Sequence, residues 1–233
     1  MSAFCERLAR IEQQIDDACS RAGRSRADVT LVPASKSQPV ERLREALACG
    51  LQLFGENRVQ EGRDKAAALP GLTWHLLGPL QSNKVRLALE VFSTLHALDR
   101  PSILAAVDRE AGRRRIRVQA FVEINLGSED SKHGFSEAEI LDQPHLFEPL
   151  EHVDLLGLMA IPPPADDPEA SRPWFRRLVQ LRDRIAAQHR WPGFVGALSM
   201  GMSDDFVQAI EEGATHVRVG TALFGRRGTP VES

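Results

Sequence analysis

The chain alternates short apolar runs with segments of helical periodicity, and this alternation limits the possible fold more than any other feature. Eight apolar runs predict strands, and each is followed by a segment that predicts a helix. Strands joined through helices pair in parallel, because a parallel connection needs a long crossover. The predicted strands cover residues 29–34, 51–54, 74–77, 91–95, 118–124, 155–159, 196–198 and 217–219.

Eight strand–helix units in 233 residues predict an α/β fold, a single (β/α)8 TIM barrel. An extra N-terminal helix precedes the units, with apolar residues at Phe4, Leu8, Ile11 and Ile15. A doubly wound open sheet would offer a GxGxxG motif after the first strand, and this sequence has none there. No linker rich in Gly, Ser or Pro divides the chain, so we expect one domain over residues 1–233.

Charge and cysteine content narrow the classes of partner. With 29 Lys+Arg against 32 Asp+Glu, the net charge of −3 disfavours nucleic acid, and the basic run 113–117 is expected at a surface helix end. We expect no signal peptide and no membrane span, because the longest uncharged run, 66–83, contains Pro and Gly. Cys5, Cys19 and Cys49 are widely spaced, which indicates no disulfide framework and a reducing cytoplasm.

In such a barrel the reactive groups follow the strands at the carboxyl face, and Lys36 is the sharpest candidate there. Counting by two from Thr30 places Lys36 on the strand face that we expect to point toward the barrel mouth. Apolar walls would favour the neutral amine, which Schiff-base formation with an aldehyde requires. The alternative is a surface lysine paired with a carboxylate.

Two glycine-containing loops follow the last two strands, where barrels commonly bind phosphate. The first contains Ser199, Met200 and Gly201, and the second contains Gly220 and Thr221. Backbone N–H groups and hydroxyls of this kind can hold an anion. Either loop alone is weak support, because Gly and Ser also cap helices.

Several other polar residues allow two interpretations. Arg218 either pairs with an acidic residue such as Glu123 in the barrel core or donates to a ring nitrogen of a bound heterocycle. His75 and His133 are expected to be structural. Glu56 and Glu61 could supply a second base, but the sequence gives this role no geometric support.

The ordered set of motifs from Val29 to Gly225 resembles the pyridoxal phosphate homeostasis protein family. These segments are Lys36 after the first strand, FGENRVQE at 54–61, WH through GPLQSNK at 74–84, GLM at 157–159, LSMGMS at 198–203 and VRVGT through FG at 217–225. The resemblance implies a barrel similar to the N-terminal domain of alanine racemase. It also implies a role in pyridoxal 5′-phosphate (PLP, vitamin B6) homeostasis without established catalytic turnover, so no catalytic residue and no metal site is predicted.

The resemblance also assigns roles to residues. PLP would be held as an aldimine on Lys36, with phosphate contacts from the two loops, Asn57 near the ring and Arg218 at the pyridine nitrogen. The cofactor-binding residues are thus predicted to be Lys36, Asn57, Ser199, Met200, Gly201, Arg218, Gly220 and Thr221. Lys84 and Lys132 match family lysines to which no role in ring binding is assigned. We expect a cytoplasmic monomer that delivers PLP to apo-PLP enzymes.

Two enzyme classes remain as alternatives. A PLP-dependent amino acid racemase needs a proton donor opposite the lysine, which in the racemase of similar fold is a Tyr. This chain contains no Tyr, which favours a carrier or regulator. A barrel aldolase would instead use Lys36 and the same loops on a phosphorylated sugar.

Overall fold

The predicted alternation folds into a barrel of eight parallel strands in a computed structural model of the whole chain. The structure describes residues 2–127, 133–147, 150–188, 191 and 193–225. Within these residues the strands are β1 (Thr30–Pro33), β2 (Leu53–Glu56), β3 (Thr73–Leu76), β4 (Thr94–Leu98), β5 (Val118–Glu123), β6 (Val153–Met159), β7 (Ala197–Ser199) and β8 (His216–Val219).

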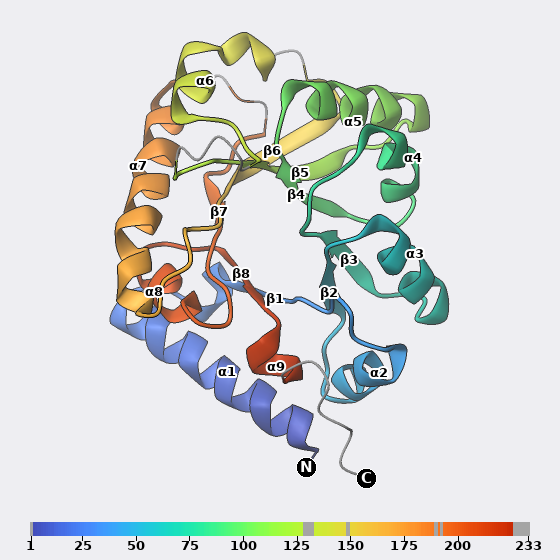
Figure 1. Cartoon of the computed structure of the whole chain (residues 1–233), viewed down its shortest axis with the longest axis vertical. Helices are drawn as coiled ribbons and strands as arrows, with labels where there is room; N and C mark the ends of the chain where they lie inside the picture. The colour runs from blue at the N-terminus through green and yellow to red at the C-terminus, as the bar shows by residue number, and fades with distance from the viewer. Residues whose placement is uncertain (1, 128–132, 148–149, 189–190, 192, 226–233) are drawn as a thin grey trace.

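The helices surround the sheet, as the view down the barrel shows (Figure 1). Their apolar faces pack against the outer side of the sheet. Because that side is buried, the strands carry few charged residues on it. The α-helices are α1 (Ala3–Arg21), α2 (Val40–Ala48), α3 (Val59–Ala68), α4 (Val85–Ala88), α5 (Pro101–Arg114), α6 (Glu137–Asp142), α7 (Arg172–Gln188), α8 (Phe206–Glu211) and α9 (Thr221–Phe224).

The sheet order β1-β8-β7-β6-β5-β4-β3-β2 places the first two strands at opposite ends of the list. The barrel closes between them through a parallel bridge from Ala34 to Gly55 and a hydrogen bond of 2.8 Å from Ser35 N to the Gly55 carbonyl. The (β/α)8 prediction and the extra N-terminal helix are therefore confirmed.

The boundaries of the second and fourth strands differ from the prediction. The fourth was placed at 91–95, but Val91 and Phe92 instead follow α4 and pack beneath it, and β4 begins at Thr94. Both segments are apolar, so periodicity alone did not separate the turn from the strand. The shift matters because it brings His96 into the strand.

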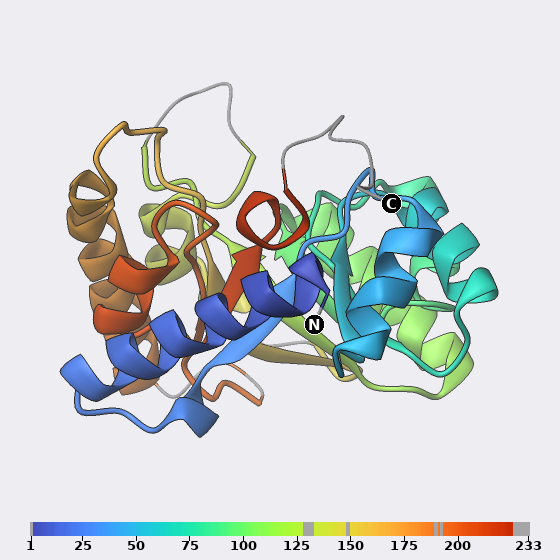
Figure 2. The same cartoon turned by 90° about the horizontal axis from the view of Figure 1, so that it is seen from below.

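Helix α1 packs against α8 and α9 and lies in front of the barrel in the view of Figure 2. Two arginines outside the strands bind the end of α9. Arg7 Nε donates to the Leu223 carbonyl and Arg42 donates to the Phe224 carbonyl, both at 2.8 Å. These bonds satisfy carbonyls that a helix end leaves without an intrahelical donor.

The structure contradicts the expectation that the cysteines form no disulfide. Cys5 in α1 and Cys49 at the end of α2 are joined, while Cys19 is free and buried. Their separation of 44 residues carries no sequence signature, because the pairing depends on how α1 crosses the barrel.

Imidazoles occupy part of the barrel interior. His75 of β3 and His96 of β4 share a hydrogen bond of 3.0 Å between Nδ1 and Nε2, and His216 of β8 lies edge-on to the Phe121 ring. Burial lowers the pKa of His75 and of His216 to about 4, and it holds the pKa of His96 well below its usual value. The imidazoles are thus neutral at pH 7.

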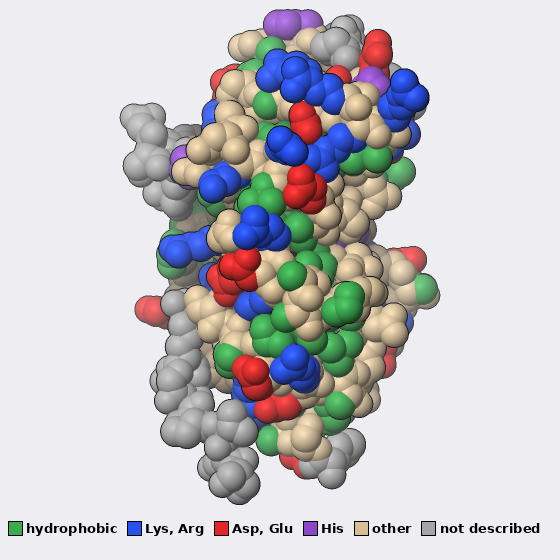
Figure 3. Space-filling model, turned by 90° about the vertical axis from the view of Figure 1, so that its right-hand side faces the viewer, with side chains coloured by type: hydrophobic (Ala, Val, Ile, Leu, Met, Phe, Trp, Pro, Cys, Tyr) green, Lys and Arg blue, Asp and Glu red, His purple; other side chains and the backbone are tan. Residues whose placement is uncertain are grey.

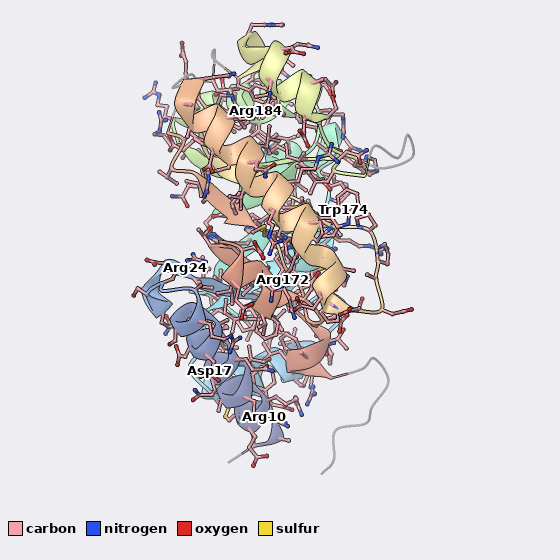
Figure 4. All side chains as sticks on the ribbon, turned by 90° about the vertical axis from the view of Figure 1, so that its left-hand side faces the viewer. Arg10, Asp17, Arg24, Arg172, Trp174 and Arg184 are labelled. Carbon is pink, nitrogen blue, oxygen red and sulfur yellow. A yellow bond between two sulfur atoms is a disulfide. The ribbon has the colours of Figure 1, made fainter. Side chains whose placement is uncertain are left out.

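Charged residues on the outer surface are largely paired with one another. Figure 3 shows basic and acidic side chains interspersed on the side of α3 and α4. The basic run ends α5, as predicted, and there Arg114 binds Glu110 while Arg117 binds Asp154. On the opposite side Arg172 joins the start of α7 to Glu211 of α8 (Figure 4). Among the helices described, none combines the length and apolar character needed to cross a bilayer.

Reduction of the Cys5–Cys49 disulfide should lower the free energy of unfolding by about 2–4 kcal/mol, because the crosslink limits the unfolded chain. Urea unfolding with and without reductant measures this difference. Cys5→Ser should abolish the effect of reductant, whereas Cys19→Ser should leave it in place. An equal response of wild type and Cys5→Ser to reductant would contradict the prediction.

The buried histidines should make the fold sensitive to mild acid. Their folded pKa values lie below the unfolded value, so the unfolded state binds more protons between about pH 4 and 6.5, and stability falls as the pH falls through that window. Between pH 7.5 and 5, His75 and His216 should each cost about 2 kcal/mol of unfolding free energy. Urea titrations at both pH values measure the loss, and His216→Gln should reduce it. An unchanged loss in that variant would show that His216 does not contribute.

Candidate functional site

A cavity of about 220 Å³ opens at the carboxyl ends of β1, β2 and β8. Five of the eight predicted cofactor-binding residues line it: Lys36, Asn57, Arg218, Gly220 and Thr221. The remaining walls include apolar side chains such as Leu77 and Ile161. The fold therefore brings residues from both ends of the chain to one cavity, as the barrel prediction requires.

Lys36 lies on the loop after β1, where its side chain is exposed at the cavity mouth. The enclosure by apolar walls that the strand pattern predicted is not observed, because β1 ends at Pro33 and Lys36 lies beyond it. The next residue, Ser37, adopts a positive φ of 60°, and its N–H donates to Glu61 Oε1 at 2.6 Å. Helix α3 thus fixes the backbone that carries the lysine.

Lys65 of α3 completes this support from inside the barrel wall. Its Nζ donates to the Ser35 carbonyl at 2.7 Å, to Glu56 Oε1 at 2.6 Å and to Glu61 Oε1 at 2.8 Å. Burial raises the pKa of Glu56, and the ion pair with Lys65 and the Ser35 hydroxyl counteract that rise. Glu56 and Glu61 therefore hold the loop. This role could not be predicted, because Lys65 is remote from Ser35 in the chain.

Asn57 follows β2 and reaches the cavity because another backbone passes very close to it. A Cβ at Gly78 would lie 2.4 Å from the Asn57 carbonyl oxygen, so only glycine allows this approach. At this point the GPLQSNK segment matters because Gly78 has no side chain, which lets the two backbones approach closely. Its Lys84 lies in a 3-10 turn and does not line the cavity.

The loop after β7 reaches the cavity with other residues than predicted. Ser199 is fully buried in the barrel, Met200 belongs to the hydrophobic core, and neither lines the cavity. Gly201 has φ +88°, and a Cβ there would lie 2.5 Å from Ala209 Cβ in α8. The lining residues are Met202, Ser203 and Asp204, which follow this turn.

Ser203 joins the loop to the start of α9. Its hydroxyl accepts hydrogen bonds from Gly220 N at 3.2 Å and Ala222 N at 3.1 Å. The loop itself is held by Asp205, whose carboxylate accepts from Met202 N at 2.7 Å. Backbone donors and hydroxyls of the two predicted loops thus converge at one end of the cavity, where Ser203 rather than Ser199 lines the wall.

Arg218 lies between the cavity and the barrel interior and is 5% exposed. One terminal nitrogen donates to the Ser199 carbonyl at 2.6 Å and to the Ser199 hydroxyl at 2.7 Å, and the other donates to the Ala160 carbonyl at 3.1 Å. Glu123 forms no ion pair with it in the described residues. Burial lowers the pKa of Arg218 to about 10, so the guanidinium is charged at pH 7.

The remaining candidates lie away from these contacts. His133 is 3.3 Å from Asp99, on the far side of the barrel mouth, and does not line the cavity. His75 is hydrogen bonded inside the barrel, as described above. Lys132 lies outside the described residues.

Comparison with known proteins assigns this arrangement to a family. Residues 7–228 match the family model "Alanine racemase, N-terminal domain". A pyridoxal phosphate homeostasis protein of Aquifex aeolicus is 45% identical over 228 residues, covering 96% of this chain and 98% of that protein. The structure of PipY from Synechococcus elongatus with PLP bound superposes with a TM-score of 0.81 at 35% identity, covering 95% of this chain and 100% of that one.

The alanine racemase of Clostridium difficile shares the fold. Its TM-score is 0.71 at 15% identity, and the match covers 94% of this chain but 57% of the racemase. The Aquifex aeolicus protein and PipY, by contrast, match this chain over nearly their whole length. The chain belongs to the pyridoxal phosphate homeostasis protein family, whose barrel is that of the alanine racemase N-terminal domain.

Proposed function

We propose that the whole chain, residues 1–233, is a single PLP-binding domain that takes part in PLP homeostasis. The observation that supports this most strongly is the lining of one cavity by an amine, a buried guanidinium and the two glycine-containing loops. These groups match the three chemical parts of PLP, namely its aldehyde, its ring nitrogen and its phosphate. The residues present therefore fit the cofactor.

Each lining group has a distinct task in this proposal. The Lys36 amine binds the aldehyde covalently, while Asn57 lies beside the ring. Arg218 donates a hydrogen bond toward the ring nitrogen and leaves it unprotonated, because a guanidinium does not give up its proton. Gly220 and Thr221 bind the phosphate.

The loop after β7 serves the same phosphate with Ser203 in the position that the resemblance assigned to Ser199. Ser203 Oγ already accepts from two backbone N–H groups, so its hydroxyl lies where anion donors converge. Met200 and Gly201 act through the shape of the turn rather than through contact. Bound PLP supplies an electrophilic carbonyl and an electron-accepting ring.

These residues fit a protein that binds and carries the cofactor better than an enzyme that converts a substrate. An unprotonated ring nitrogen weakens the ring as an electron sink, and no Tyr is present as an acid opposite the lysine. The exposed position of Lys36 at the mouth also leaves the covalent bond open to exchange with solvent amines. We therefore propose that the protein passes PLP to apo-PLP enzymes. The further proposal of a cytoplasmic monomer rests on the family resemblance and not on the cysteines, because Cys5 and Cys49 form a disulfide.

Borohydride treatment of the PLP-loaded protein should fix the cofactor on Lys36. Peptide mass mapping then finds the reduced adduct at that residue, and Lys36→Ala loses it. Lys84→Ala is the matched control, because Lys84 also follows a barrel strand, β3, but does not line the cavity. An adduct at another lysine in the wild type would contradict the assignment of Lys36. Adduct formation with a phosphorylated sugar but not with PLP would favour the aldolase alternative.

The loaded protein should restore activity to an apo-PLP enzyme while showing no amino acid racemisation above that of free PLP. The transfer is measured against an equal concentration of free PLP, and racemisation is measured with L-alanine by chiral chromatography. Racemisation that exceeds free PLP and disappears in Lys36→Ala would support the racemase alternative instead.

A further inference from the structure

Ser199, His96 and His75 form a continuous hydrogen-bonded chain behind Arg218. The Arg218 nitrogen lies 2.7 Å from Ser199 Oγ, which lies 2.8 Å from His96 Nδ1, and His96 Nε2 lies 3.0 Å from His75 Nδ1. All four residues are less than a tenth exposed. The chain starts at the cavity wall and runs inward through the barrel.

This chain crosses the interior rather than following the sheet. Ser199 ends β7 and His96 lies in β4, and these strands are separated by β5 and β6 in the sheet order. A bond between them must therefore span the inside of the barrel. Burial of polar groups such as these costs free energy unless each group is hydrogen bonded. We therefore expect this hydrogen-bonded chain to make a contribution that offsets the cost of its burial.

The donors and acceptors along the chain have one consistent direction. Arg218 can only donate, so Ser199 Oγ accepts from it. The Ser199 hydroxyl can then donate a hydrogen bond to His96 Nδ1, and in that arrangement His96 carries its proton on Nε2 and donates to His75 Nδ1. A neutral His96 is required for this arrangement, and burial together with the nearby charge of Arg218 keeps its pKa well below the usual value.

We propose that Ser199 and His96 are positioning residues that orient the Arg218 guanidinium toward the ring nitrogen of the bound cofactor. Two backbone carbonyls already hold the terminal nitrogens of Arg218. The Ser199 hydroxyl adds a third acceptor whose own position is fixed by His96 across the barrel. The inference rests on the proposed binding of PLP, and it gives Ser199 a role in place of phosphate contact.

The test compares PLP with its deaza analogue, in which carbon replaces the ring nitrogen. Wild-type protein should bind PLP more tightly than the analogue, because only PLP accepts a hydrogen bond from Arg218. Ser199→Ala should weaken PLP binding about tenfold and change binding of the analogue by less than about twofold. Dissociation constants come from titration of the visible absorbance of the bound ligands.

Two variants of His96 separate the hydrogen bond from packing. His96→Leu should act like Ser199→Ala, whereas His96→Asn should retain most PLP affinity, because its side chain offers an acceptor near the original Nδ1. Thr94→Val is the matched control. It removes another buried hydroxyl from β4, one that contacts Gln119 rather than Ser199, and it should leave both affinities unchanged.

Other results would overturn the inference. Equal weakening of PLP and of the deaza analogue in Ser199→Ala and in His96→Leu would show a general structural role. Equal affinity of the wild type for the two ligands would show that Arg218 does not bind the ring nitrogen. Failure of the wild type to bind either ligand would overturn the proposed function as well, which distinguishes the two cases.

Discussion

The site depends on how the barrel is closed between β1 and β2. The Lys65 ammonium lies at this closure and binds the Ser35 carbonyl after β1 and the Glu56 carboxylate at the end of β2. A buried ion pair of this kind contributes little net stability against a hydrophobic pair, but an unpaired partner would be a buried charge without compensation. The pair therefore specifies the geometry of the closure. Lys36 directly follows Ser35, whose carbonyl takes part in that closure.

Two polar clusters support the cavity: one lies between the strands β1 and β2 and helix α3, and the other lies inside the barrel. The Lys65 cluster supports the backbone of the Lys36 loop, and the Ser199–His96–His75 chain supports the Arg218 side chain. Both are built largely from buried groups joined by hydrogen bonds, which restricts their movement. In the proposed function, a cofactor with an aldehyde at one end of the ring and a nitrogen at the other would need Lys36 and Arg218 held at a fixed separation, and these two clusters would provide it.

The sequence predicted the fold well because the strand–helix alternation is local information. The same holds for Lys36, Asn57, Arg218, Gly220 and Thr221, whose positions after strands decide that they reach the mouth. Ser199 and Met200 do not line the cavity, because a position in the loop after a three-residue strand does not tell which loop residue turns outward. That distinction depends on Gly201 packing against α8.

Contacts across the barrel could not be predicted from the sequence, for a different reason. His96 was hidden by an error of three residues in the start of β4, and its partner Ser199 lies far away in the chain. Nothing in the sequence around Lys65 indicates that its amine is buried, and only the fold shows that it contacts Glu56. Likewise, the cysteines gave no spacing motif, and their pairing follows from the path of α1.

The sheet order has a consequence for the sequence of events during synthesis. The last strand, β8, pairs with the first, as in Thr30 opposite His216, and it inserts between β1 and β7. Until the ribosome has released β8, the growing chain has an open β1 edge and no Arg218 or α9. The lysine loop is thus made early, but the cavity can first take its final shape when nearly the whole polypeptide has emerged, which ties cofactor capture to completed chains.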